Sequence, residues 1–511
     1  MQENAVVQET NSINQEQISG QNVVRVVEKT ETVETKRLQE HYNFFGPVTF
    51  LYAVFYAFCM FRNGSGITFP FFLAGTLLYF VFSLSKLGIT LKKGSAFYMI
   101  SILLLGVSTF CTDGWAIIGL NKLAVFLLVM CLLLNQYFDT TKWRLGKYVG
   151  SICQLVVMSF GELGKPFSDG KAYFREKGKV NKKVWYGLLG VVIALPILLI
   201  AAGLLSSADA VFRKMTTDFM NWIRPGNVFN VVIRVTFLFF ASYALTSYLC
   251  KRSIPEEVKD RRKGEPVLAI TIMSLLSLLY LLFSGIQIFG LFLGKMQLPE
   301  GYTYAQYARE GFFQLLLVSG INVVLIITAQ RRFVSSKALR ALLVFLTVCT
   351  YLMEASSAMR MMLYVNAYGL TYLRLLVLWF LSLLALILGA AVYTVFHEDF
   401  RLFRFTLIAS MALWLVFAFA RPDAIAARYN LAKHGLDDTT EAEIAHECSS
   451  DAIGALRPYF ADIAGRSEDS TAYLNLTISV MREYSARGVR GFNFSVWEAM
   501  RTAEDFIDAY T

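Results

Sequence analysis

Stretches of about 20 apolar residues recur along the chain from residue 44 to residue 420, and each could cross a hydrocarbon core about 30 Å thick as a helix. Only 17% of the 511 residues are charged. Soluble domains carry about 25% charged residues, so the composition also favours a bilayer. We therefore predict an all-α fold, a polytopic transmembrane helical bundle.

The apolar stretches, taken one by one, predict about eleven spans, each bounded to within a few residues. The short stretch 96–112 is the one most open to a different count. The predicted spans cover residues 44–61, 67–85, 96–112, 115–136, 184–206, 228–250, 267–293, 311–330, 338–362, 372–396 and 402–420.

Lys and Arg are concentrated in alternate loops of this arrangement. Ten lie in 137–183, six in 251–263 and four in 331–340. Because basic loops stay on the cytoplasmic side, we expect a multi-pass protein of the cell membrane with a cytoplasmic N-terminus. An odd number of spans places the C-terminus outside the cell, and one miscounted span would reverse it. The same loops account for most of the net charge of +10, so we expect no nucleic-acid partner.

The chain divides into three parts. Residues 1–43 are polar, lack the apolar region of a signal peptide, and are predicted to form a disordered cytoplasmic tail. The bundle follows over 44–420. Its basic cytoplasmic loop, 137–183, contains a segment, 145–167, that predicts a helix on the membrane surface or, alternatively, a short re-entrant segment. Residues 421–511 hold nine Lys/Arg and fifteen Asp/Glu with repeated helix-capping signals, and predict a small helical extracytoplasmic domain.

Ionisable side chains inside the predicted spans are the sharpest functional signal, because they are expensive in a bilayer and are usually kept for a reason. Glu354 and Arg360 lie in one span. They are six residues apart, about 120° from facing each other on a helix, so a simple pair between them is not expected. We expect Glu354 to meet a cation of another helix, and the candidates are Arg309, Arg234 and Lys122.

Polar side chains from distant helices converge at the outer end of the predicted bundle, as a ligand site or an ion-pair cluster. Structural roles are the alternative: Arg360 reaching to the interface, Asp209 capping a helix, and the tyrosines forming an aromatic belt. The predicted cluster comprises Asp209, Arg234, Arg309, Glu310, Glu354, Arg360, Tyr364 and Tyr368, with Asp423 and Asn430 at the junction with the C-terminal segment.

Motifs for metal, cofactor or nucleophilic chemistry are not found. The seven cysteines form no CxxC pair, and His446-Glu447 does not complete HExxH. The chain also has no Gly-rich phosphate loop and no defensible Ser/His/Asp arrangement. We expect no cofactor and no metal, and we assign no catalytic residue.

Several characteristic sequence segments follow one another along the chain: SADAVF, YAREGFFQLL, MEASSAMRMMLYVNAYGLTYLRL, RPDAIAARYN, SSDAIGAL and FNFSVWEAMR. Together they resemble the bacterial integral membrane family catalogued as domain of unknown function 4173, with its relative 4153, over roughly residues 185–511. The resemblance implies a bacterial multi-pass protein with a helical C-terminal tail and no established activity. Arg421 stands where the resemblance leads us to expect Asn.

Three classes of function fit these features. The first is a transporter-like or sensing membrane component whose outer polar cluster binds a small-molecule or protein ligand. The second is a signalling or structural scaffold that binds partners through its C-terminal domain. The third is an enzyme acting on an envelope or lipid-linked substrate with Asp209, Glu310 and Glu354, and we lean against it. The bilayer is the one expected partner common to all three, and the sequence does not predict an oligomeric state.

Overall fold

The computed structural model describes residues 31–176, 225–257, 263–289, 303–436, 448–465, 478–485 and 487–510, with isolated pieces between 190 and 215 and at 301, 440 and 444. Every regular element in these ranges is a helix, which confirms the all-α prediction for the described part of the chain. The predicted span 184–206 lies largely outside the described residues.

Nine described helices are long and apolar enough to cross a membrane, judged by length and composition. A further apolar helix, α5 (Ser95–Cys111), is shorter and matches the predicted span 96–112. The count of eleven is therefore not established, whereas a multi-pass bundle is. The nine helices are α3 (Tyr42–Met60), α4 (Thr68–Leu87), α6 (Trp115–Tyr137), α11 (Pro225–Cys250), α12 (Pro266–Gln287), α13 (Tyr304–Arg332), α14 (Lys337–Tyr368), α15 (Tyr372–Phe396) and α16 (Leu402–Phe419).

Polar side chains set the helix ends by satisfying backbone groups that lack a partner within the helix. Thr303 begins α13 with a reciprocal capping box to Gln306. Ser336 begins α14 and Thr371 begins α15, each accepting a hydrogen bond from a first-turn backbone N–H. At the other end of a helix, Gly88 terminates α4 with φ +72°, a left-handed conformation that favours glycine.

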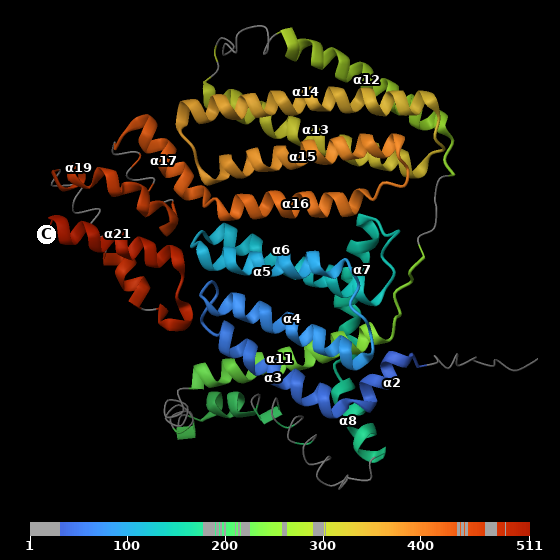
Figure 1. Cartoon of the computed structure of the whole chain (residues 1–511), viewed down its shortest axis with the longest axis vertical. Helices are drawn as coiled ribbons and strands as arrows, with labels where there is room; N and C mark the ends of the chain where they lie inside the picture. Colours follow the sequence, from blue (N-terminus) through green and yellow to red (C-terminus); the bar gives the residue numbers. More distant parts are fainter. Residues whose placement is uncertain are drawn as a thin grey trace, which may run out of the picture.

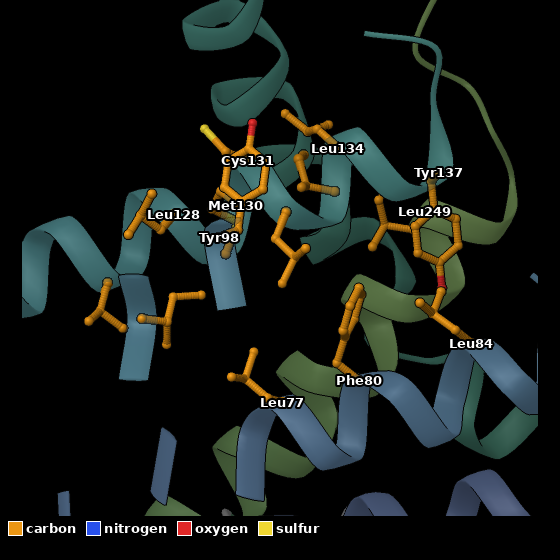
Figure 2. Close-up of a cluster of buried hydrophobic side chains, with 14 of the residues drawn as sticks. Leu77, Phe80, Leu84, Tyr98, Leu128, Met130, Cys131, Leu134, Tyr137 and Leu249 are labelled. Atoms are coloured by element: carbon orange, nitrogen blue, oxygen red, sulfur yellow. The ribbon is translucent and has the colours of Figure 1, made fainter. Parts of the chain in front are cut away.

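The bundle is built around two large apolar cores (Figure 1). The first half comprises α3 to α6, α7 (Leu145–Ser159), α11 and α16, and the second half comprises α12 to α15. Figure 2 shows part of the first core, where Leu77 and Phe80 of α4 pack with Leu128 and Leu134 of α6. Helix α16 contacts both α5 and α15 and joins the halves. Its Trp414 donates a hydrogen bond of 2.8 Å to buried Asn121.

A C-terminal helical domain covers one end of the bundle, which we call the tail end (Figure 1). Its core packs Leu431, Leu456, Phe460 and Phe506. The opposite end, where α2 (Val33–Glu40), α7 and α8 (Lys165–Glu176) lie, is called the basic end. The described elements of the domain are α17 (Pro422–His434), η3 (Ser450–Tyr459), α19 (Phe460–Gly465), η4 (Val489–Gly491) and α21 (Phe494–Tyr510).

The last part of the segment 1–43 is ordered, although the sequence predicts a disordered tail there. Thr32 caps helix α2, and Leu38 is fully buried in the first core. The Thr32 hydroxyl also bonds the carbonyl of Cys250, which ties α2 to the end of α11. A polar sequence can order when it gains such caps and one buried anchor, which composition alone does not reveal. The preceding residues 1–30 lie outside the described part.

Helix α7 lies within the segment 145–167 that predicts a surface helix. Its Tyr148 and Leu155 are buried against the bundle, whereas Leu145, Val149 and Val157 on the other face are exposed. An exposed apolar face beside a transmembrane bundle suits contact with lipid.

Candidate functional site

Three groups of the predicted cluster, Arg360, Tyr364 and Tyr368, lie together on the last turns of α14. The Arg360 guanidinium lies against Gly311 of α13 so closely that a methyl group there would overlap it. The rings of Tyr364 and Tyr368 pack at a tilt of 58°, and Tyr364 lies under Arg374 of α15, whose guanidinium carbon is 4.3 Å from the Tyr364 ring centroid. Arg374 also donates to the carbonyl of Tyr368 at 2.8 Å. These contacts tie the tail ends of α13, α14 and α15 together.

Glu354 lies one and a half turns earlier in α14 and is buried, with 6% of its surface exposed. Neither carboxyl oxygen has a hydrogen-bond partner within the described residues. None of the described side chains forms an ion pair with Glu354, and the side chains of Arg309 and Glu310 lie outside the described part. The carboxyl group is therefore buried without a described cation, beside the backbone of Ala385.

The other predicted members lie in or beside the first half. Arg234 is exposed on α11, with its guanidinium 6.0 Å from the ring of Phe61. Asp209 is exposed and accepts a hydrogen bond of 2.6 Å from the backbone of Phe212, a local capping contact. Lys122, expected as a partner of Glu354, lies instead over the ring of Phe69 in the first half. The described members of the predicted cluster therefore do not form one site.

The two predicted junction residues hold backbone segments in place. Asp423 accepts hydrogen bonds from the backbone N–H and the hydroxyl of Ser449. The Asn430 amide accepts from the Leu370 N–H at 2.7 Å and donates to the Leu370 carbonyl at 2.9 Å. It thereby fixes the turn between α14 and α15 at Gly369, whose φ is +78°. Both residues organise the tail end.

Arg421 binds the C-terminal domain to the bundle. Its guanidinium donates to the carbonyl of Cys111, at 2.8 Å from Nη2, and pairs with Glu498 of α21 and with Asp451 of η3. Its backbone has φ +51°. This is the position at which the resemblance led us to expect Asn, another residue that tolerates a left-handed backbone.

A second set of tail-end contacts has no signal in the sequence. Arg487 of the C-terminal domain pairs with Asp113 in the turn between α5 and α6. Buried Asn493 donates to the carbonyls of Ser65 and Thr112, which lie in two different turns of the bundle. Only local spacing is visible in a sequence, and these partners are separated by more than 370 residues.

The basic end holds a different kind of feature, a cavity of about 910 Å³. It lies between the two halves, with walls from α5, α6, α7 and α16 on one side and from α13, α14 and α15 on the other. Its size falls within the range of small-molecule sites. Eight Lys/Arg and two acidic residues line it: Lys92, Lys93, Lys142, Arg144, Arg331, Arg340, Arg401, Arg404, Glu398 and Asp399.

The cationic groups of this basic cavity are only partly compensated by protein. Lys92 donates to two main-chain carbonyls, those of Asn135 and Phe138, each at 2.7 Å. Arg340 pairs with Glu398 at 3.7 Å, but both side chains are about half exposed, so the pair contributes little. Burial lowers the pKa of Lys92, as expected where positive charge is incompletely solvated. The described lining therefore carries an excess of positive charge.

Apolar side chains form much of the remaining lining, together with a few uncharged polar residues. Tyr148 of α7 stacks on Phe403 of α16 with ring centroids 4.3 Å apart. Leu407 and Ile408 continue this wall along α16 toward the middle of the bundle, and Leu343 of α14 lies among the lining residues of the second half. The basic cavity therefore has both cationic and apolar lining residues, so it is amphipathic.

Sequence reasoning counted Lys142, Arg144, Arg331 and Arg340 only as markers of membrane orientation. The clearest missed signal was Arg404, an arginine within the first turn of the last span, close to Glu398 and Asp399 in sequence. As for metals, the described residues contain no group of three or more His, Cys, Asp or Glu side chains able to hold an ion.

Comparison with known families matches residues 99–459 to the family described as Domain of unknown function (DUF4153). This is the relative named beside the resemblance, and membership of family 4173 itself is not shown. The match begins within α5, so it includes helices that the resemblance did not cover. No curated protein and no solved structure matches the chain.

Proposed function

This chain belongs to the family described as Domain of unknown function (DUF4153), and from its geometry we propose that it is a transporter-like or sensing membrane component that binds an anionic phospholipid in the basic cavity. The observation that carries the proposal is the excess of eight cations over two acids around one cavity between two helical halves.

The phosphate of a lipid headgroup suits the cationic part of this site. Arg and Lys are the common ligands of phosphate oxygens, and Arg binds them with two parallel hydrogen bonds. Arg401 and Arg404 at the start of α16 have exposed side chains and form no ion pair with the described residues. Basic pockets between transmembrane helices on the cytoplasmic side are known lipid-headgroup sites.

The lipid's acyl chains suit the apolar part of the cavity lining. The stacked pair of Tyr148 and Phe403 and the side chains of Leu407 and Ile408 give the cavity an apolar wall that continues along α16. A small soluble anion would leave this wall uncovered. An amphiphile covers both surfaces, which favours a phospholipid over free phosphate.

The proposal includes an orientation. Because basic loops face the cytoplasm, the basic end is assigned to the inner face of a bacterial cell membrane, with the N-terminus inside and the C-terminal domain outside. Lipid would then bind at the level of the inner headgroups. A ligand there contacts both halves, so binding can be sensed as a change between them or can accompany movement of the lipid.

Quenching of Trp143 tests the proposal, since this residue lines the cavity and is buried. The protein is placed in nanodiscs of phosphatidylcholine containing either brominated phosphatidylglycerol or brominated phosphatidylcholine. The signal of Trp143 is the difference between the wild type and Trp143→Phe. We expect it to be quenched by a small fraction of the anionic lipid and far less by the zwitterionic lipid.

The double variant Arg401→Gln/Arg404→Gln should lose this preference. A hydrogen bond to a charged group contributes about 1.5–3 kcal/mol, so each lost contact weakens binding about 10- to 100-fold. Lys36→Gln/Arg175→Gln removes two exposed charges from α2 and α8 at the same end and serves as the matched control. Equal quenching of the wild type by the two lipids, or wild-type behaviour of the cavity variant, would overturn the proposal.

A further inference from the structure

The buried carboxyl group of Glu354 is a second feature, separate from the basic cavity. It lies on α14 in the second half, near the backbone of Ala385 on α15. Both oxygens are shielded from solvent and unpartnered within the described residues. The neighbouring Tyr351 hydroxyl does not help it, because it donates to the Ala385 carbonyl at 2.7 Å.

Charged groups on the helices around Glu354 do not offset a negative charge. Helix α15 has no titratable residue between Arg374 and Tyr393, and α13 has none between Gly311 and Gln330. The one titratable side chain of α12 is Tyr280, whose hydroxyl donates to Asn322.

On α14 itself, Tyr351 and Cys349 are neutral neighbours of Glu354 in sequence. Arg360 lies about 9 Å further along the axis and about 120° around it, against Gly311. A carboxylate in such surroundings is costly on insertion scales, whereas the neutral acid avoids most of this cost.

A series of polar side chains follows the same face of α14. Thr347, Thr350, Glu354 and Ser357 are spaced by three and four residues, so their side chains form one buried stripe. Thr350 accepts a hydrogen bond of 3.0 Å from Asn322 of α13, which in turn bonds Tyr280 of α12. The hydroxyls of Thr347, Thr350 and Ser357 donate to main-chain carbonyls one turn earlier, so the stripe is polar but is not a hydrogen-bonded chain to Glu354.

We propose that Glu354 is a proton-binding site in the interior of the second half, occupied by a proton in the described conformation. The Thr347–Thr350 part of the stripe lies on its basic-end side and places buried polar groups in that direction. The proton joins one carboxylate oxygen as an O–H bond, and its release restores the carboxylate. This goes beyond lipid binding and depends on none of the residues of the basic cavity.

Infrared difference spectroscopy of the whole protein in lipid measures the protonation of this group directly. The wild-type spectrum minus that of Glu354→Gln at neutral pH contains the bands of the Glu354 carboxyl. A protonated site predicts a carboxylic-acid carbonyl band that shifts in deuterium oxide. Carboxylate stretching bands instead of this acid band would overturn the proposal. The Glu354 side chain must give one kind of band or the other.

Raising the pH separates a proton site from a permanently neutral structural acid. We expect the acid band to convert reversibly to carboxylate bands while the amide bands show an intact bundle. An acid band that persists until the bundle unfolds would also overturn the proposal. Glu398→Gln is the matched control, because this exposed side chain should contribute only carboxylate bands at neutral pH. Neither measurement involves phospholipid selectivity, so this proposal and the proposed function can fail separately.

Discussion

Arg487 and Asp113 join the C-terminal domain to the first half of the bundle: the guanidinium Nη2 of Arg487 lies 2.7 Å from Oδ1 of Asp113, in the turn between α5 and α6. Both side chains are mostly buried. Ser450 of η3 donates to the other oxygen of the same carboxylate at 3.1 Å. The C-terminal domain is therefore attached to the turns of the bundle by charged hydrogen bonds.

Replacing Arg487 with Ala should loosen the C-terminal domain without unfolding the spans. The change removes a hydrogen bond between charged groups, so we expect docking to weaken by about 1.5–3 kcal/mol. Hydrogen–deuterium exchange should rise in η4 and α21 and stay constant in α12. Arg482→Ala, an exposed arginine of the same domain, is the control. Equal protection of α21 in Arg487→Ala and the wild type would contradict the expected role.

Arg421→Asn should lower thermal stability although Asn accepts the same left-handed backbone. The substitution leaves buried Asp451 without its cation and the Cys111 carbonyl without its donors. We expect a loss of about 1.5–3 kcal/mol in the free energy of unfolding of the domain. Glu498→Gln should cost less, because Glu498 is partly exposed. Unfolding followed by the fluorescence of Trp497 provides the measurement, and a ranking of the two variants in the opposite order would argue against this account.

The docked domain should become less stable as the pH rises through the raised pKa of Asp451. Burial raises the pKa of this carboxyl above its usual 3.8, and the nearby Asp423 raises it further. The folded state therefore holds a proton that the unfolded chain has already released. The resulting stability is present below the usual pKa and is lost on passing upward through the raised one. The melting temperature, measured across this pH window, should depend less steeply on pH in Asp451→Asn than in the wild type. An unchanged dependence would show that another group causes the effect.

Asn430→Leu should destabilise the connection between α14 and α15. The Leu side chain fills similar volume but leaves the buried N–H and carbonyl of Leu370 unpaired. Each unpaired group costs about 1–3 kcal/mol. We expect a lower melting temperature and faster exchange at Leu370. Asn366→Leu, at an exposed position near the end of α14, is the control and should change neither quantity.

Membrane-impermeant maleimide should distinguish the two ends of the bundle. Val489 in η4 is 89% exposed at the tail end, and Arg175 in α8 is exposed at the basic end. In intact cells we expect Val489→Cys to be labelled and Arg175→Cys to be labelled only after the membrane is opened. The reverse pattern would invert the proposed orientation and place the basic cavity at the outer face.

Much of the fold could be predicted because its cause is local in the sequence. Apolar stretches long enough to span a bilayer define α3, α4 and the other long helices, and capping residues such as Ser336 mark where they begin. Even the short helix α5 follows from its apolar composition. Helix α2 was not predicted, because its order depends on contacts with distant parts of the chain such as Cys250.

The candidate sites could be predicted only in part. Glu354 stands out in the sequence because a carboxyl group in an apolar stretch is costly wherever the helix packs. Which helix faces it cannot be read from spacing, and the expected neighbour Lys122 lies in the other half. The basic cavity depends on how four separate loops meet. Counting the charges of each loop indicates the side of the membrane on which that loop lies. It does not show that side chains from separate loops line one cavity.

The position of α16 has a consequence for biosynthesis. This helix contacts α5 of the first half and α15 of the second, and Trp414 supplies the partner of the buried Asn121 amide. It is also the last long apolar helix in the chain order of the described residues. The ribosome must therefore finish nearly the whole bundle before the Asn121 amide oxygen acquires its Trp414 donor, whereas the Asn121 NH2 group can bond Ser108 and Thr109 of α5 much earlier.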